Sequence, residues 1–200
     1  MTAQLLTGAA IAEKLDDLAT LRLTIFEEYP YLYRGRRDDE LKYLQSYAET
    51  ADACVILAAD GAKVIGAATG LPLVHADLQT RTAFAGSPYP LAGIYYLGEL
   101  LLLSAYRSRG RGQKLLAQME GHIRSLGRYS SFLCATVERP ADHPLRPPGY
   151  LPISRFLGRT GFVRLPGVST EFAWRETDGV KRQHPMQFWS KELVGAVQAP

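Results

Sequence analysis

A short run of glycines and basic residues is the part of this sequence best suited to chemistry. Residues 107–113 read RSRGRGQ, and the run contains no carboxylate. It follows an apolar stretch, 94–103, and precedes residues 113–126, where apolar side chains recur at helical spacing. A strand, a glycine-rich turn and a helix in this order point backbone N–H groups at an anion, with the positive end of the helix dipole behind them. The run therefore predicts a cradle for a polyphosphate.

Two well-known phosphate motifs do not fit this spacing. A Walker loop needs G-x-x-x-x-G-K-[ST], and neither Gly110 nor Gly112 has such partners. A dinucleotide fingerprint needs a further glycine three residues after Gly112, where this chain has Leu115. A solvated basic turn stays open as an alternative. Nucleic acid is not an expected partner, because the net charge is only +3 and no RNP or helix-turn-helix pattern accompanies the run.

The spacing Arg107-x-x-Gly110-x-Gly112 resembles the acyl-CoA pyrophosphate loop of the GNAT N-acetyltransferase superfamily. A later segment, SRFLGRTGFVRL, resembles the part of that family where a short helix runs into a strand through Gly-Phe. The resemblance covers residues 50–193. It implies an enzyme that transfers an acetyl group from acetyl-CoA to an amine, without a metal.

The apolar pattern predicts an α+β fold that fits the same family. Helices are expected over 11–29, 38–49, 110–126 and 153–159, and strands over 53–59, 64–73, 94–103, 131–137, 170–175 and 186–192. Asp60-Gly61 predicts a hairpin turn. This order favours a three-layer fold with a mixed central β-sheet flanked by helices. Because 200 residues at 46% apolar composition suffice for one core, we expect a single domain over 1–200.

The resemblance also implies where the cofactor binds. Strand 94–103 is expected to splay from strand 131–137 through a bulge, and the pantetheine arm would lie in the gap. Three leucine backbones would bind the pantetheine, and the basic run would bind the pyrophosphate. The residues assigned to acetyl-CoA are Leu100, Leu101, Leu102, Arg107, Ser108, Arg109, Gly110, Arg111, Gly112 and Gln113.

Glu99 is the candidate general base. Acetyl transfer needs a neutral amine, so a base must take a proton from the ammonium form. Glu99 is the only acid in its apolar strand and stands directly before the cofactor-binding leucines. Burial there would raise the pKa of its carboxyl toward useful basicity. The alternative is that Glu99 pairs with an arginine and only orders the strand or the substrate.

The general acid is where this chain departs from the family pattern. Many members place a tyrosine four residues before the glycine of Gly-Phe, and that position is Leu157 here. Tyr150 is the nearest tyrosine in sequence and is our candidate, while Ser154 is closer but a poorer acid. The departure keeps a second hypothesis open, namely an acyl-CoA-binding or regulatory module with little turnover.

Two segments are candidates for the acceptor site. Residues 138–152 form a long, proline-rich connection, and the resemblance places it beside the acceptor pocket. Residues 27–37, EEYPYLYRGRR, put carboxylates among aromatic rings, a combination that suits a cationic amine. The candidate substrate contacts are Glu27, Tyr29, Tyr31, Arg139 and His143.

Other features of the sequence indicate little further chemistry. Cys54 and Cys134 lie in apolar runs and are interpreted as reduced core thiols. No residue set has metal-ligand spacing, and no membrane span or secretory signal is evident, so a cytoplasmic location is expected. His184 is interpreted as a solvated turn residue beside Lys181 and Arg182. Edge strands leave a homodimer open.

Overall fold

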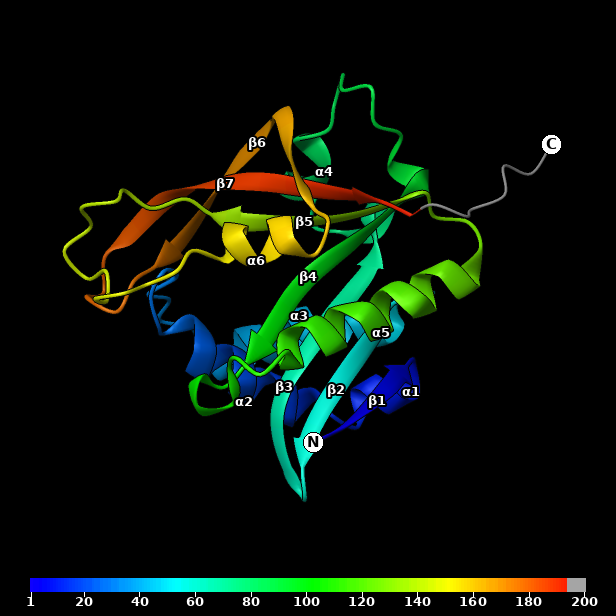
Figure 1. Ribbon diagram of the computed structural model, residues 1–200, viewed down its shortest axis with the longest axis horizontal. Coiled ribbons are helices and arrows are strands. Elements are labelled where there is room, and N and C mark those ends of the chain that lie inside the picture. The colour runs from blue at the N-terminus through cyan, green and yellow to red at the C-terminus, as the bar shows by residue number, and fades with distance from the viewer. Residues whose placement is uncertain (194–200) are drawn as a thin grey trace.

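The computed structural model describes residues 1–193 as a seven-stranded sheet with helices on both faces (Figure 1). The strands are β1 (Thr2–Thr7), β2 (Cys54–Asp60), β3 (Lys63–Pro72), β4 (Ile94–Leu102), β5 (Ser131–Val137), β6 (Val163–Arg175) and β7 (Lys181–Glu192). The α-helices are α1 (Ala9–Ala12), α2 (Leu15–Phe26), α3 (Arg37–Glu49), α4 (Leu78–Thr82), α5 (Arg111–Leu126) and α6 (Ile153–Arg159). Single 3-10 turns are η1 (Leu73–His75), η2 (Leu91–Gly93) and η3 (Ser104–Tyr106).

The sheet is mixed, in the order β1-β2-β3-β4-β5-β7-β6. Among the described strands, β4 and β5 form a parallel pair and the other neighbours are antiparallel. The β2–β3 hairpin turns at Asp60-Gly61 as predicted, with Gly61 at φ 59°. The structure therefore has the mixed central sheet that the sequence predicts.

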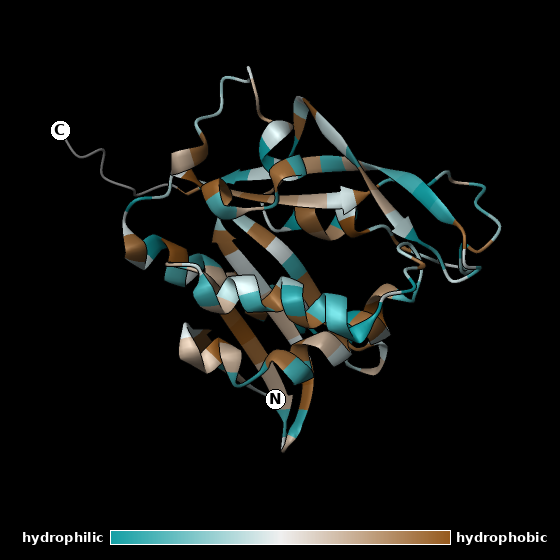
Figure 2. Cartoon of the chain, turned by 180° about the vertical axis from the view of Figure 1, so that it is seen from behind, coloured by the Kyte–Doolittle hydropathy of each residue, from teal (hydrophilic) through white to brown (hydrophobic). Residues whose placement is uncertain are grey.

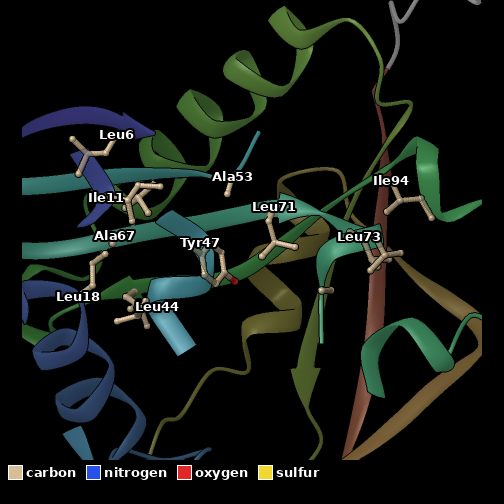
Figure 3. Packing of buried hydrophobic residues seen from close by; sticks show 14 of the residues in the cluster. Leu6, Ile11, Leu18, Leu44, Tyr47, Ala53, Ala67, Leu71, Leu73 and Ile94 are labelled. Carbon is tan, nitrogen blue, oxygen red and sulfur yellow. The ribbon is translucent and has the colours of Figure 1, made fainter. Parts of the chain in front are cut away.

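Two apolar cores cover opposite faces of this sheet. One core packs α1, α2 and α3 against the sheet, and Figure 3 shows Leu18, Leu44 and Tyr47 packed beside Ala67 and Leu71. The other core packs α5 and α6 on the opposite face. Since the central strands are covered on both sides, they are largely brown in Figure 2, whereas the far part of the β6–β7 hairpin is largely teal.

Helix α5 matches its prediction because its apolar pattern has a strong helical period. Leu115, Leu116, Met119 and Ile123 are all at most 2% exposed and face β2, β3 and β4. The helix ends at Gly127, whose φ of 69° forms a left-handed cap. The element that follows the predicted phosphate cradle is thus firmly anchored to the sheet.

The single helix predicted over 11–29 is wrong. The chain instead forms α1 and α2, which are separated by a turn at residues 13–14, and α2 ends at Phe26. Both helices pack on α3, but they lie on different strands: α1 contacts mainly β1, whereas α2 contacts mainly β3 and β4. The apolar period continues through the turn, so the sequence pattern does not reveal it.

The N-terminal and C-terminal strands also differ from the prediction. β1 and α4 were not expected, β6 begins at Val163 rather than 170, and β7 begins at Lys181 rather than 186. The longer β7 includes His184, so the interpretation of that residue as a solvated turn residue is wrong. His184 is 2% exposed and its ring stacks on Trp174 at 3.7 Å between centroids.

A gap opens between β4 and β5. The two strands pair only from Ile94↔Ser131 to Leu97↔Cys134, although β4 continues to Leu102. Figure 1 shows β4 diverging from β5 beyond this point. The β5-facing edge of residues 98–102 therefore has no partner strand within the described part of the chain. The splayed strands that we expected are present.

Candidate active site

The loop between β4 and α5 has an unusual backbone. Three consecutive residues, Ser108, Arg109 and Gly110, have positive φ angles of 70°, 56° and 72°. Glycine adopts this conformation freely, but serine and arginine do so at a cost of roughly 1 kcal/mol or more each. Strain of this kind concentrates at ligand-binding turns, so the backbone geometry agrees with the functional interpretation of this loop.

The backbone N–H groups of this loop are left open for an acceptor. Within residues 1–193, only Arg111 among residues 108–113 donates its N–H to a backbone carbonyl, that of Ser108 at 3.5 Å. No side chain caps α5 at Gly110, and its first turn holds no acidic residue. An anion at this place would receive several N–H groups and the positive end of a 16-residue helix.

Basic side chains surround the same helix end. Arg109, Arg111 and Lys114 line a hollow of about 380 Å³ together with Gln118 and residues of the N-terminal strand. Arg107 instead turns back to the protein, because its Nε donates to the Leu102 carbonyl at 2.9 Å and its Nη2 lies 2.6 Å from a Glu28 oxygen. Of the three predicted arginines, Arg107 thus braces the loop, whereas Arg109 and Arg111 line the hollow. Arg111 also donates through Nη1 to the Tyr106 carbonyl at 3.3 Å.

Gly98 forms a bulge at the point where the strands part. Thr69 of β3 stands opposite Glu99 and Gly70 stands opposite Leu97, so Gly98 is the extra residue. A Cβ at this position would overlap the hydroxyl of Tyr47. The bulge also sets the direction of Glu99, which follows it directly. Leu100, Leu101 and Leu102 come next along the open edge of β4.

The carboxyl of Glu99 is buried and fully engaged. Its side chain is 2% exposed and forms an ion pair with Nη1 of Arg22. The Tyr43 hydroxyl donates to its Oε1 at 2.7 Å, and the Thr69 hydroxyl donates to its Oε2. The Arg22 guanidinium also pairs through Nε with the buried carboxylate of Glu40. One guanidinium therefore serves two buried carboxylates.

Burial raises the pKa of Glu99 above its ordinary value, and Arg22 and the Tyr43 hydroxyl counteract part of this rise. For Arg22, burial alone would lower the pKa of the guanidinium, but Glu99 and its other neighbours leave that pKa raised. The sequence hypothesis of a buried acid with a raised pKa is consistent with this geometry. So is the alternative that Glu99 pairs with an arginine, because the residue does both.

The comparisons with known proteins agree with this geometry. The model of the acetyltransferase (GNAT) family matches residues 17–145, which is more than half of the chain. The chain belongs to the GNAT acetyltransferase family. No protein with a curated description is a significant match in sequence.

Solved structures of GNAT proteins share the whole fold at low sequence identity. One is yncA from Salmonella typhimurium, solved with its cofactor acetyl-CoA, at 14% identity and a TM-score of 0.61 over 100% of this chain and 98% of that one. An aminoglycoside 6'-N-acetyltransferase complexed with coenzyme A has 16% identity and a TM-score of 0.61, covering 97% and 98%. A ribosomal-protein-alanine N-acetyltransferase from Brucella melitensis has 16% identity and a TM-score of 0.60, covering 96% and 99%. The α+β fold of GNAT type is confirmed.

In this chain a buried leucine occupies the position at which many GNAT proteins carry the acidic tyrosine. Leu157 of α6 is 2% exposed and packs with Phe162 in the core on the α5 side of the sheet. Tyr150 is half-buried and its ring meets that of Tyr29 edge-on at 4.7 Å. Burial raises the pKa of Tyr150, so its hydroxyl keeps its proton at neutral pH. Tyr150 stays a candidate acid.

The structure brings the predicted acceptor residues together from two distant segments. The Tyr29 ring lies 5.5 Å from the His143 imidazole and beside Tyr150. Tyr31 packs on Phe26 at 4.6 Å, and its hydroxyl has no hydrogen-bond partner among residues 1–193. Glu27 is the residue that follows α2, at the end of the helix next to this aromatic group. Rings from residues 26–31 and from the loop 138–152 thus share one wall.

Arg139 has a different environment from the one we expected for a substrate contact. Its side chain is 8% exposed, donates to the carbonyls of Pro30 and Tyr31 at 2.7 and 3.0 Å, and pairs with Glu176 at 2.6 Å. It ties the predicted acceptor wall to the β6–β7 hairpin. The Trp174 indole N–H, which donates to the Tyr31 carbonyl at 2.9 Å, makes a second tie.

Four residues around Glu99 were missed by the sequence analysis: Arg22, Glu40, Tyr43 and Thr69. The sequence does indicate one of them, because Arg22 is a lone charge in the apolar run LATLRLTIF. The others lie 30 to 59 positions from Glu99 and are joined to it only by the fold. Within residues 1–193 no helix has the length and apolar character of a membrane span, and no cluster of side chains there is arranged to hold a metal ion.

Proposed function

We propose that this chain is an N-acetyltransferase that moves an acetyl group from acetyl-CoA to a primary amine of a small molecule or a protein. The observation that carries the proposal is that two neighbouring stretches of backbone have unpaired hydrogen-bonding groups within the described part of the chain. N–H groups at residues 108–113 suit the diphosphate, and the unpaired edge of β4 at residues 98–102 suits the pantetheine amides. Two fold neighbours were solved with acetyl-CoA or coenzyme A, which supports this ligand.

The reaction needs two proton transfers that the chain's own residues can serve. The amine nitrogen forms a bond to the thioester carbonyl carbon, the carbon–sulfur bond breaks, and the sulfur leaves as a thiolate. An amine that enters as its ammonium form loses one proton before attack, which passes through the base to solvent; the neutral nitrogen then loses one more on forming the amide, and the thiolate gains one. Glu99, at the bulge beside the gap, is the proposed base because its raised pKa favours proton uptake. Tyr150, which keeps its hydroxyl proton at neutral pH, is the proposed acid.

The acceptor would enter between residues 26–31 and the loop 138–152. Glu27, Tyr29, Tyr31 and His143 would contact it, and a cationic amine suits the aromatic rings. Arg139 would support this wall through the Pro30 and Tyr31 carbonyls. The cytoplasmic location and the homodimer considered from the sequence stay predictions.

A second candidate function rests on one observation. Because the buried Leu157 occupies the family's acid position, a module that binds acyl-CoA without turnover is the competing hypothesis. Calorimetry with acetyl-CoA, followed by a thiol-release assay over a panel of primary amines, separates the two. Binding and saturable release support the transferase. Binding without release for any amine supports the module, and no binding overturns both.

A further inference from the structure

The ion-pair cluster beside the gap contains one positive and two negative groups. Arg22 from α2 pairs with Glu40 from α3 and with Glu99 from β4. The side chains of both glutamates are 2% exposed and that of Arg22 is 12% exposed. When both carboxyls are ionised, the trio carries one net negative charge out of reach of bulk water. Such a cluster has a strong tendency to take up one proton.

Each carboxylate has its own hydroxyl donors. Tyr33 donates to Glu40 at 2.7 Å. Tyr43 donates to Glu99 at 2.7 Å, and its hydroxyl also lies 2.9 Å from that of Tyr47. The Arg22 guanidinium is held between the rings of Phe26 and Tyr43, with its central carbon 5.0 and 4.2 Å from their centroids. These contacts fix the distance between the two carboxylates and the cation.

We propose that Arg22 and Glu40 are positioning residues for Glu99. They hold its carboxyl at the bulge, and their opposite charges together set the pH at which this carboxyl loses its proton. Arg22 favours the ionised form of Glu99 and Glu40 opposes it. As for catalysis, the inference rests on the proposed function, in which Glu99 is the base. The geometry itself does not depend on that role.

Other groups contact Glu99 or lie near enough to act on its charge, and they must be kept constant in a test. They are Tyr43 and Tyr47 on α3, Tyr31 before α3, Tyr96 on β4 and the Thr69 hydroxyl on β3. Burial raises the pKa of each of these four tyrosines, so they stay neutral at the pH values of interest. Arg22 and Glu40 are therefore the charged groups whose removal should change the pKa of Glu99 most directly.

The test is a titration of Glu99 by carbon NMR of ¹³C-carboxyl-labelled glutamate in the full chain, with the resonance assigned by its loss in Glu99→Gln. Glu40→Gln removes the opposing negative charge, so the midpoint should move to lower pH by about one unit. Arg22→Gln removes the favourable charge, so the midpoint should move about one unit or more to higher pH. Arg22→Lys keeps the charge and should restore most of the wild-type midpoint.

Glu120→Gln is the matched control. Glu120 lies on α5, on the opposite face of the sheet, and is also ion-paired, with Arg124 and Lys191. It should leave the Glu99 midpoint unchanged. Shifts of equal sign for Arg22→Gln and Glu40→Gln, or no shift for Glu40→Gln, overturn the inference. If Arg22→Gln does not fold, Glu40→Gln and Arg22→Lys still decide the matter.

The pH dependence of acetyl transfer supplies a second readout. The acidic limb of the kcat/KM profile should move with the NMR midpoint in each variant, because this ratio reports ionisation of the free enzyme and the base acts only when ionised. If wild-type protein acetylates no amine while the midpoints move as stated, the proposed function fails and the electrostatic inference stands. If transfer occurs but its acidic limb ignores both substitutions, the catalytic half of the inference fails.

Discussion

The hydroxyl of Tyr47 occupies the space in which residue 98 would carry a Cβ atom, so Gly98 and Tyr47 fit together as a pair. The glycine forms the bulge between Thr69 and Gly70 of the neighbouring strand, and the tyrosine is 1% exposed in the core. The bulge comes directly after Leu97, the last residue of β4 that pairs with β5. The close fit of Gly98 and Tyr47 therefore lies at the point where the gap opens.

Gly98→Ala should lower the free energy of unfolding by about 1–3 kcal/mol, because the added methyl group displaces a rigid, buried ring. Chemical denaturation measures the change. Gly121→Ala is the control, since a Cβ there meets nothing within 4 Å and alanine in a helix interior stabilises by about 0.5–1 kcal/mol. Equal effects of the two substitutions would show that Tyr47 does not restrict residue 98.

Gly112→Asp should abolish acetyl-CoA binding while the protein stays folded. A Cβ at 112 has only ordinary contact with Phe156 at 3.8 Å, and an acid in the first turn of a helix is favourable for the helix itself. The carboxylate would however occupy and repel the diphosphate position. Calorimetry checks the loss, with Gly121→Asp on the exposed part of the same helix as the charge-matched control. Unchanged binding in Gly112→Asp would show that the diphosphate does not bind at this turn.

Glu99→Gln should lower kcat by roughly 100-fold or more, the usual contribution of a general base. The wild-type rate should rise with pH through the raised pKa of Glu99, because only the carboxylate accepts a proton. The variant should lose this rise. Rates measured from pH 5 to 9 test the point, and a variant that keeps the wild-type profile would remove Glu99 as the base.

Tyr150→Phe should reduce kcat about 10-fold or more with little change in the KM for acetyl-CoA, if the hydroxyl protonates the leaving thiolate. The ring contact with Tyr29 does not need the hydroxyl, so the acceptor wall should stay intact. Tyr29→Phe is the matched control on the same wall. An equal fall in both variants would point to acceptor binding instead of proton transfer.

Local patterns predicted the β2–β3 hairpin and the helix that follows the proposed diphosphate loop. The alternation around Asp60-Gly61 and the helical period from Leu115 to Ile123 depend on neighbours a few positions apart, and both are confirmed. The break between α1 and α2 and the burial of His184 depend on packing against other elements, which the spacing of apolar residues does not show. The same holds for Thr69, which donates to Glu99, and for Glu40, which is joined to Glu99 through Arg22; both are brought there only by the fold. A charge inside an apolar helix, as at Arg22, is the one local sign of this cluster.

The short seam between β4 and β5 makes the sheet two wings, joined by the four residue pairs from Ile94↔Ser131 to Leu97↔Cys134. Beyond the seam the wings are tied by the backbone bridge between Tyr33 and Glu176. The side chains of Arg139 and Trp174 add to it by reaching across to residues 30 and 31. A ligand bound between the wings would hydrogen-bond to the β5-facing edge of β4, which has no partner strand there within the described part of the chain. The occupant would then act as a missing strand, and the rigidity of the sheet would depend on it.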